Sequence, residues 1–309
     1  MTGGTVQYPE LPVNYLSVKE KLKLIVIVGP TASGKSDLGI FLAQKISGEI
    51  ISADSRQLYR GMDIGTGKVS KKEQKLVPHH LLDVANPKND FSVALYKKLG
   101  EEVLSDIFKR GKIPIIVGGT GFYIDALLGQ DFPEVPPNKK LRAKLEKQSA
   151  EQLFTRLKKL DPRRAKVIDK KNKRRLIRAL EIVIITGKPI PLLKTELKYN
   201  VLWLGIRPKD LKNRIKKRLE QRFKRGMIQE VQKLHANGVS YRRLENFGLE
   251  YGWVAQYLQK YITLEEMKGG LLKAIFRYAK RQLTWFKPKN EIHWIKTKSQ
   301  ALRLARQFL

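Results

Sequence analysis

A glycine-rich run from Gly29 to Ser36 constrains the fold of this chain more than any other feature. The run is Gly-Pro-Thr-Ala-Ser-Gly-Lys-Ser. It follows an apolar stretch from Leu22 to Val28, which has the character of a buried strand, and it precedes a segment from Asp37 to Ala43 with helical periodicity. A strand, a glycine loop and a helix in this order predict a phosphate-binding loop, in which backbone N–H groups surround a phosphate at a helix N-terminus.

Two side chains of this loop have expected roles of their own. Lys35 is placed to reach the outer phosphate, and the Ser36 hydroxyl is placed to hold Mg²⁺ as a cofactor. The motif predicts a di- or triphosphate ligand but does not say which one. The predicted phosphate-binding residues are Gly29, Pro30, Thr31, Ala32, Ser33, Gly34, Lys35 and Ser36.

The composition excludes several classes of protein. Among the 309 residues there is no cysteine, which excludes disulfides, thiolate metal sites and thiol nucleophiles. No apolar run reaches the length of about 18 residues that suggests a membrane span. Residues 1–19 lack the pattern of a secretory signal. We therefore expect a cytoplasmic protein, monomeric and without a membrane partner.

The positive charge of the chain is concentrated in its middle. Lys and Arg outnumber Asp and Glu by 17 to 15 in residues 1–138 but by 30 to 8 in residues 139–225. A segment so basic would repel itself without a polyanion. The distribution predicts a nucleic-acid partner, with an acidic membrane surface as the weaker alternative.

Strand and helix patterns alternate in the first part of the chain. The predicted strands are Leu22–Val28, Glu49–Ser52 and Ile113–Val117, and a helix is expected from Ser92 to Arg110. This alternation predicts an α/β fold: a parallel sheet covered by helices, of the kind found in phosphate-loop NTPases. Prolines between Asp131 and Pro137 mark a boundary.

The remainder is predicted to be helical apart from two strands. Leucine and isoleucine stripes from Asn138 to Leu193 indicate a helical insertion. Val201–Gly205 is the predicted return to the sheet, a long helix runs from Leu211 to Phe223, and Ile292–Ile295 is the last strand. We expect residues 1–134 and 201–309 to form the catalytic core and residues 135–200 to form a basic insertion that binds RNA.

Two predicted strands are followed by polar side chains that are candidates for catalysis. Asp54 follows the second strand, and Thr120 follows the third within a run of three glycines. Ligands of open parallel sheets bind beyond the carboxyl ends of the strands, so Asp54 is expected near the phosphate loop, where a carboxylate can accept a proton. Neither strand ends in the acidic pattern of NTP-hydrolysing motors, which disfavours an ATPase.

Basic helix segments supply further candidates. Arg214 and Arg218 share a helix face, and Lys280 and Arg281 lie in a second basic helix. Either pair could neutralise pyrophosphate or RNA phosphate, and a solvated helix face remains the alternative. His79 and His80 lack partners at metal-ligand spacing, which favours a structural role.

Taken together, these residues resemble the bacterial tRNA dimethylallyltransferase family, also called tRNA isopentenyltransferase. The resemblance covers about Leu24 to Trp294, nearly the whole chain. The segments that carry it are Gly29–Ser36, Ile51–Lys68, Val77–Asp83, Val117–Tyr123, Arg178–Glu181 and Ala279–Phe286.

The resemblance implies an activity and a set of roles. It implies transfer of a dimethylallyl group from its pyrophosphate to the exocyclic amine of the adenosine just after the anticodon. The loop would then hold the pyrophosphate leaving group, Asp54 would be the general base, and Thr120 would lie at the contact between tRNA and donor. The implied tRNA-contact residues are Asp54, Ser55, Arg56, Gln57, Thr120, Arg174, Arg175, Leu176, Ile177 and Arg178, to which the basic residues Lys280 and Arg281 are added.

The chain departs from the family pattern in three places. Thr66–Val69 replaces a commoner Thr-Ala-Lys-Pro, Glu245–Leu249 replaces a Gln-Ala-Ile-Gly-Tyr segment, and Ile275-Phe276 stands where Thr-Arg is usual. Three other interpretations stay open: a nucleotide kinase, a prenyltransferase of free adenine nucleotides, and a non-catalytic RNA-binding protein.

Overall fold

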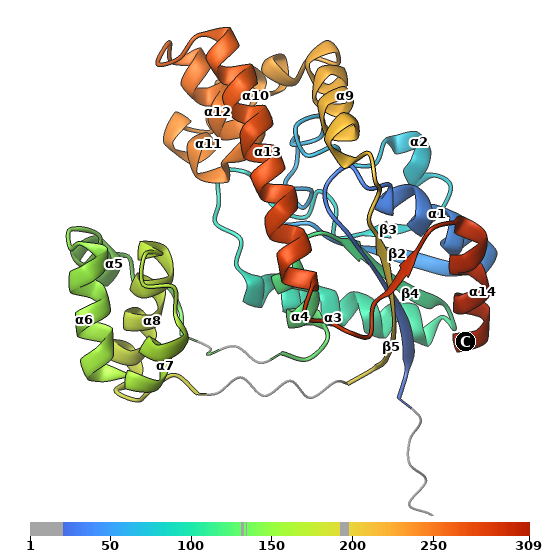
Figure 1. Cartoon of the computed structure of the whole chain (residues 1–309), viewed down its shortest axis with the longest axis horizontal. Coiled ribbons are helices and arrows are strands. Elements are labelled where there is room, and N and C mark those ends of the chain that lie inside the picture. Colours follow the sequence, from blue (N-terminus) through green and yellow to red (C-terminus); the bar gives the residue numbers. More distant parts are fainter. Residues whose placement is uncertain (1–20, 131–132, 134, 192–197) are drawn as a thin grey trace, which may run out of the picture.

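A parallel six-stranded sheet forms the centre of the molecule (Figure 1). The structure is a computed structural model that describes residues 21–130, 133, 135–191 and 198–309. The strand order is β3-β2-β4-β1-β5-β6, and every neighbouring pair is parallel. The strands are β1 (Lys23–Val28), β2 (Gly48–Ala53), β3 (His79–His80), β4 (Ile113–Gly118), β5 (Asn200–Ile206) and β6 (His293–Ile295).

The predicted fold class is therefore confirmed, and five strands lie within one residue of their predicted ends. β3 was not predicted, because its two residues are too few to show a hydrophobic period. His80 pairs there with Ile51 of β2. Its Nε2 lies 2.7 Å from Oε2 of the buried Glu49, whose carboxylate also binds Arg110. His79 Nδ1 lies 2.9 Å from the carbonyl oxygen of Val77, so both histidines have structural partners.

Helices cover both faces of the sheet because its central strands are apolar on both sides. Alternate residues of β1 enter different hydrophobic clusters: Leu24 and Val26 pack on one face, Ile25 and Ile27 on the other. The face of Ile25 is covered by α1 (Lys35–Lys45) and α14 (Lys298–Phe308). The opposite face is covered by α3 (Val93–Lys109) and α4 (Gly121–Leu127), while α2 (Lys71–Gln74) is a single turn in the β2–β3 connection. The Ser92 hydroxyl caps α3 by accepting the Leu95 N–H at 3.1 Å, as expected from the predicted helix start.

Four helices between α4 and β5 surround a hydrophobic cluster of their own. They are α5 (Lys139–Glu146), α6 (Ala150–Leu160), α7 (Pro162–Val167) and α8 (Lys173–Thr186). Leu145, Leu153 and Leu180 are fully buried in that cluster. The predicted end of this helical stretch, Leu193, lies outside the described residues, as does part of the predicted boundary at 131–137.

A second group of helices follows β5 and stands over the carboxyl edge of the sheet (Figure 1). It consists of α9 (Leu211–Lys224), α10 (Met227–Ala236), α11 (Tyr241–Phe247), α12 (Leu249–Leu258) and α13 (Leu264–Phe286). Its buried hydrophobic residues belong to the same cluster as the α3 and α4 face of the sheet, so this group is continuous with the core. The long α13 runs from this group down to α4, which links the group to the sheet.

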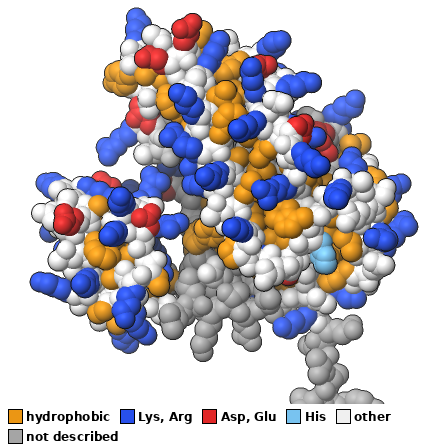
Figure 2. Space-filling model, viewed as in Figure 1, with side chains coloured by type: hydrophobic (Ala, Val, Ile, Leu, Met, Phe, Trp, Pro, Cys, Tyr) orange, Lys and Arg blue, Asp and Glu red, His pale blue; other side chains and the backbone are white. Residues whose placement is uncertain are grey.

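Lysine and arginine side chains are spread over the visible face of the molecule and are dense on the α5–α8 unit (Figure 2). Among the described residues, none of the helices has both the length and the apolar character that a membrane crossing requires.

Candidate active site

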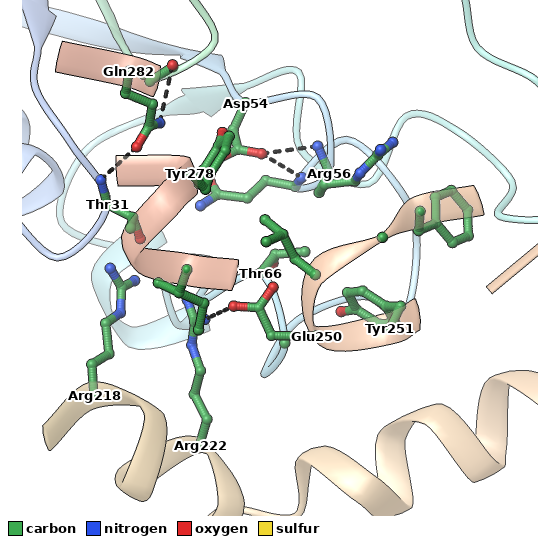
Figure 3. Close-up of a pocket in the computed structure, with 18 of the residues that line it drawn as sticks. Thr31, Asp54, Arg56, Thr66, Arg218, Arg222, Glu250, Tyr251, Tyr278 and Gln282 are labelled. Atoms are coloured by element: carbon green, nitrogen blue, oxygen red, sulfur yellow. Dashed lines mark hydrogen bonds and ion pairs between the residues drawn. The ribbon is translucent and has the colours of Figure 1, made fainter. Parts of the chain in front are cut away.

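One pocket lies where β1, β2 and β4 end and where α9, α11, α12 and α13 approach the sheet edge (Figure 3). Its empty volume is about 820 Å³, which includes the part open to solvent. It is lined by Thr31, Lys35, Ser36, Asp54, Arg56, Gln57, Gly65, Thr66, Val117, Gly118, Gly119, Arg218, Arg222, Phe247, Gly248, Leu249, Glu250, Tyr251, Ile275, Tyr278 and Gln282. The fold thus brings the phosphate loop, Asp54 and Arg218 together, although they lie far apart in the sequence.

The phosphate loop has the backbone that an anion cradle requires. Gly34 precedes α1 with φ +94°, and no side chain caps the first N–H groups of that helix. These groups remain available to a ligand at the positive end of the helix dipole. A Cβ at Gly29 would lie 2.4 Å from the carbonyl oxygen of Ile206, so only glycine fits there. The hydroxyl of Ser33 is buried without a protein partner, which suits a bound phosphate oxygen.

Two half-buried cations lie at this loop. Desolvation, together with the charge of Arg218, lowers the pKa of Lys35 to about 7, and Asp54 opposes this shift. Lys35 Nζ donates to the carbonyl oxygen of Pro30 at 2.7 Å. Desolvation and the neighbouring Arg222 likewise lower the pKa of Arg218 to about 10. Cations kept close together in a pocket favour binding of a polyanion, which restores the charge balance.

A buried ion pair between α9 and α12 lies next to these cations. Arg222 and Glu250 are both buried and form a salt bridge between α9 and α12. Arg218 and Arg222 rise from α9 toward the loop (Figure 3), and Arg218 also donates to the carbonyl oxygen of Gly67 at 3.1 Å. The Glu250 carboxylate therefore offsets one positive charge and leaves Arg218 to face the pocket.

Asp54 is oriented by the turn that follows β2. Its Oδ1 accepts the backbone N–H of Arg56 at 2.9 Å and of Gln57 at 3.4 Å, so the turn uses one carboxylate oxygen. None of the described residues donates a hydrogen bond to the other oxygen, which leaves it for a ligand. The Thr120 hydroxyl accepts the N–H of Ser55 at 3.3 Å, which joins the ends of β2 and β4. The predicted residues Asp54, Ser55, Arg56, Gln57 and Thr120 therefore form one connected corner of the site.

Gln282 of α13 joins the phosphate loop to the end of β4. Its Oε1 accepts the Thr31 N–H at 2.7 Å, and its Nε2 donates to the Gly119 carbonyl oxygen at 3.0 Å. Tyr278, one turn earlier, lies beside Asp54 in Figure 3. Burial raises the pKa of the Tyr278 phenol, and the Asp54 charge raises it further, so Tyr278 stays protonated near the carboxylate.

A loop that follows β2 is fixed by one carboxylate of α10. Glu230 accepts the backbone N–H groups of Asp63 at 2.9 Å, Ile64 at 2.6 Å and Gly65 at 2.9 Å. The Tyr251 hydroxyl donates to the same carboxylate at 2.8 Å. Gly65 and the next residue line the pocket, so Glu230 sets the position of this wall.

The structure places some predicted residues outside the pocket. Arg214 is exposed and does not line the pocket: it lies one helical turn before Arg218, nearer the start of α9, and donates there to Asp210 at 2.8 Å. Lys280 and Arg281 are exposed on α13 and turned away from Gln282.

The predicted RNA-contact segment on α8 contains both exposed and buried residues. Arg174 and Arg175 are exposed, whereas Leu176 and Ile177 are buried in the α5–α8 cluster. The side chains of Leu176 and Ile177 form the core of their own unit, and the place of these two residues in a tRNA-contact segment stays a prediction. Arg178 donates to Glu181 at 2.6 Å and to the Val135 carbonyl oxygen at 2.9 Å, so it links α8 to the segment before α5.

Sequence reasoning missed several lining residues. Two of the three segments that depart from the family pattern supply Phe247, Gly248, Leu249 and Ile275, and the third supplies Thr66. Leu249 adopts φ +41°, a conformation uncommon outside glycine. A departure from a family pattern was the only sequence signal at these positions. The other lining residues absent from the predicted site are Gly65, Val117, Gly118, Gly119, Arg222, Glu250, Tyr251, Tyr278 and Gln282.

Comparison with known proteins identifies the family. The family model described as IPP transferase matches residues 57–289, and one described as isopentenyl transferase matches residues 22–84. The chain belongs to the IPP transferase family. A tRNA dimethylallyltransferase from Pelotomaculum thermopropionicum is 43% identical over 295 residues, which covers 92% of this chain and 94% of that protein. A tRNA dimethylallyltransferase 1 from Geotalea uraniireducens is 42% identical, with coverage of 93% and 96%.

Solved structures agree with this membership. The tRNA isopentenylpyrophosphate transferase from Bacillus halodurans has a TM-score of 0.68 at 37% identity, covering 93% of this chain and 95% of the other. A eukaryotic dimethylallyltransferase acting on tRNA has a TM-score of 0.76 at 30% identity, covering 93% and 77%. The resemblance drawn from the sequence is confirmed, and with it the assignment to a transferase family of tRNA dimethylallylation.

Proposed function

We propose that this protein transfers a dimethylallyl group from dimethylallyl pyrophosphate to the exocyclic amine of the adenosine just after the anticodon of tRNA, releasing pyrophosphate. The observation that carries the proposal is that a carboxylate, Asp54, shares one pocket with the phosphate loop and Arg218. A prenyl transfer of this kind requires a base for the amine and an anion site for the leaving group within one cavity.

The reaction forms one bond and breaks one bond. The amine nitrogen attacks the first carbon of the donor, and the carbon–oxygen bond to pyrophosphate breaks with its electron pair passing to oxygen. The proton of the amine passes to Asp54, since an aryl amine gains nucleophilicity when its proton leaves as the bond forms. Backbone N–H groups of the loop, Lys35 and Arg218 stabilise the charge that develops on pyrophosphate.

The site fits a magnesium ion bound together with pyrophosphate. Ser36 lines the pocket next to Lys35, and the buried Ser33 hydroxyl lacks a protein partner. Among the described residues no group of three or more His, Cys, Asp or Glu side chains could hold a metal. This suits Mg²⁺, which keeps its waters and binds through one protein oxygen and substrate phosphates. When bound through Ser36, it would neutralise charge on the leaving pyrophosphate.

The exposed cations would hold the tRNA. We assign Arg174 and Arg175 of the 135–200 insertion, and Lys280 and Arg281 of α13, to phosphate contacts, because all four are exposed. Arg214 is also exposed and is a candidate for RNA phosphate instead of pyrophosphate. Asp54, Arg56 and Gln57 line the pocket, where an extruded adenine would arrive, and the bonded pair Ser55 and Thr120 adjoins them. A monomer in the cytoplasm, where tRNA is found, is the form that we propose.

The direct test uses purified protein, undermodified tRNA and dimethylallyl pyrophosphate. Mass spectrometry of the tRNA nucleosides should find one adenosine enlarged by one dimethylallyl group, with release of one pyrophosphate. Transfer to free AMP and not to tRNA would instead assign the chain to the adenine-nucleotide prenyltransferases. Phosphoryl transfer from ATP to a nucleotide would assign it to the kinases. The basic surface of residues 139–225 argues against both, because a free nucleotide needs no such surface.

A further inference from the structure

Two exposed aromatic side chains contact each other beside the pocket. Phe122 lies in the first turn of α4, and Trp285 lies in the last turn of α13. Each of these residues is 39% exposed. Their ring centroids are 6.5 Å apart and their planes meet at 75°. A single exposed apolar side chain is ordinary, but two large rings in contact form an exposed aromatic patch.

Trp285 is held in one orientation although it is exposed. Its indole Nε1 donates to Asp125 Oδ2 at 3.1 Å. A Cβ on Gly121 would lie 2.1 Å from the indole, so the ring packs directly on the backbone at that glycine. An aromatic ring fixed before binding loses little conformational entropy when a ligand covers it.

The two rings lie next to residues of the pocket, on α13 and at the end of β4. Tyr278 and Gln282 line the pocket from α13, and Trp285 follows them at helical spacing on the same face. On the other side, Phe122 is two residues after Thr120, which sits at the corner that joins β2 and β4. A ligand that enters the pocket with a neighbouring group attached would place that group against these rings.

One exposed cation, Arg281, lies one turn before Trp285 on the same face of α13. Lys280 and the C-cap Lys287 are exposed at the same end of this helix. The acidic side chain at the pair, Asp125, is engaged by Trp285 and by Lys289 at 3.0 Å. Aromatic rings beside exposed cations are the combination that binds unpaired nucleotides, by stacking the base and neutralising the phosphate.

We propose that Phe122 and Trp285 form a stacking platform for an unpaired base of the RNA substrate, adjacent to the base that enters the pocket. This inference rests on the proposed function in taking the partner to be an RNA loop. The platform fixes the register of the loop, while the cations of α8 and α13 supply attraction to the phosphates. Stacking releases no counterions, so its loss weakens binding without changing the salt dependence.

The test measures the dissociation constant of a tRNA anticodon stem-loop with the full chain. Phe122→Leu combined with Trp285→Leu keeps apolar volume but removes both rings, and it should raise the dissociation constant about 5- to 150-fold, as expected when one base no longer stacks. The slope of log K against log salt should stay that of the wild type. Phe122→Tyr with Trp285→Phe keeps the rings and should stay within about threefold. Tyr261→Leu removes the ring of a residue that is 71% exposed just before the start of α13, far along the chain from Trp285; it is the matched control and should bind normally.

A second measurement tests for a specific base. Replacing the loop nucleotides one at a time by abasic residues should weaken wild-type binding at one position next to the target, and that same change should have no effect in the double Leu variant. Unchanged stem-loop affinity in the double Leu variant, with normal binding of dimethylallyl pyrophosphate as evidence of folding, would overturn the platform. A wild-type dimer that the double Leu variant converts to monomer would also overturn it, because the rings would then face a second copy. Failure of dimethylallyl transfer by the wild type would refute the proposed function instead, and the stem-loop experiment separates the two outcomes.

Discussion

The cations of the pocket at the sheet edge are paired or partly buried, whereas those of the α5–α8 unit that were predicted to bind RNA are mostly exposed. In the pocket, Arg222 is paired with Glu250, and Lys35 and Arg218 are desolvated enough to lower the pKa of each. On α8, Arg174 and Arg175 stand in solvent. A desolvated, converging site holds a small polyanion in one geometry, whereas dispersed exposed cations attract an extended polyanion. Donor binding and tRNA binding should therefore be separable by mutation.

The largest effect is expected at Asp54. Asp54→Asn keeps an oxygen that can accept the N–H groups of Arg56 and Gln57 but cannot take a proton from the amine. The rate of transfer should fall roughly 10²- to 10⁴-fold, the usual contribution of a general base, while the dissociation constant for tRNA stays within a few-fold. Single-turnover kinetics at saturating tRNA and donor measure it. A rate within about tenfold of the wild type would remove Asp54 from the mechanism.

The second effect concerns the stability of the α5–α8 unit. Glu181 is fully buried and accepts hydrogen bonds from Arg142 at 2.7 Å, Arg178 at 2.6 Å and the Asn138 N–H at 2.7 Å. Glu181→Leu should lower the free energy of unfolding by about 1.5–3 kcal/mol, the contribution of hydrogen bonds to a charged group, because both arginines can turn to solvent. Chemical denaturation monitored by circular dichroism measures it. An unchanged free energy of unfolding in Glu181→Leu would show that the hydrogen bonds of this carboxylate do not stabilise the unit.

The same carboxylate gives that unit a pH dependence of defined sign. Burial alone raises the pKa of Glu181, but the hydrogen bonds from Arg142, Arg178 and Asn138 outweigh burial and leave it below its ordinary value. A carboxyl whose pKa is depressed by folding contributes stability above its unfolded pKa, and this stability is lost as the pH falls through the folded value. The wild type should therefore lose stability on acidification more steeply than Glu181→Leu.

The third effect concerns the pH dependence of donor binding. With a pKa of about 7, Lys35 in the free protein loses its charge as the pH rises above neutrality. Binding pyrophosphate then requires uptake of a proton, so affinity should fall by up to about tenfold per pH unit above the pKa of Lys35. Lys35→Ala should bind donor weakly at every pH and lose this slope. Isothermal titration in two buffers of different ionisation enthalpy measures the proton uptake, and a wild-type slope that persists in Lys35→Ala would assign it to another group.

The smallest effect is expected at the exposed arginines of α8. Arg174→Ala with Arg175→Ala should raise the Michaelis constant for tRNA several-fold and lower the salt slope by about 0.7 to 0.9 for each phosphate that the variant no longer neutralises. The donor dissociation constant should not change, because the donor site lies in the sheet pocket. Replacing both residues by Lys keeps the charge and should restore most of the affinity. Weakened donor binding with an unchanged salt slope would contradict the separation of the two regions.

The sequence by itself determined the sheet and the phosphate loop. Long apolar strands and a glycine loop followed by a helix depend on local pattern, so the predicted ends of β1, β2, β4 and β5 lie within one residue of the observed ones. Asp54 was also found from the sequence, because parallel strands carry their carboxyl ends to one edge of the sheet. The motifs then sufficed to indicate the family.

Only the tertiary structure decided which basic and apolar side chains reach the ligand. Arg218 and Arg214 share a helix and a residue type, yet one faces the pocket and the other faces Asp210. Leu176 and Ile177 adjoin exposed arginines but are buried. Gln282 joins the loop after β1 to the end of β4 across 251 and 163 positions of sequence. These outcomes depend on how helices pack over the sheet, and that packing is set by contacts between distant segments that no local period records.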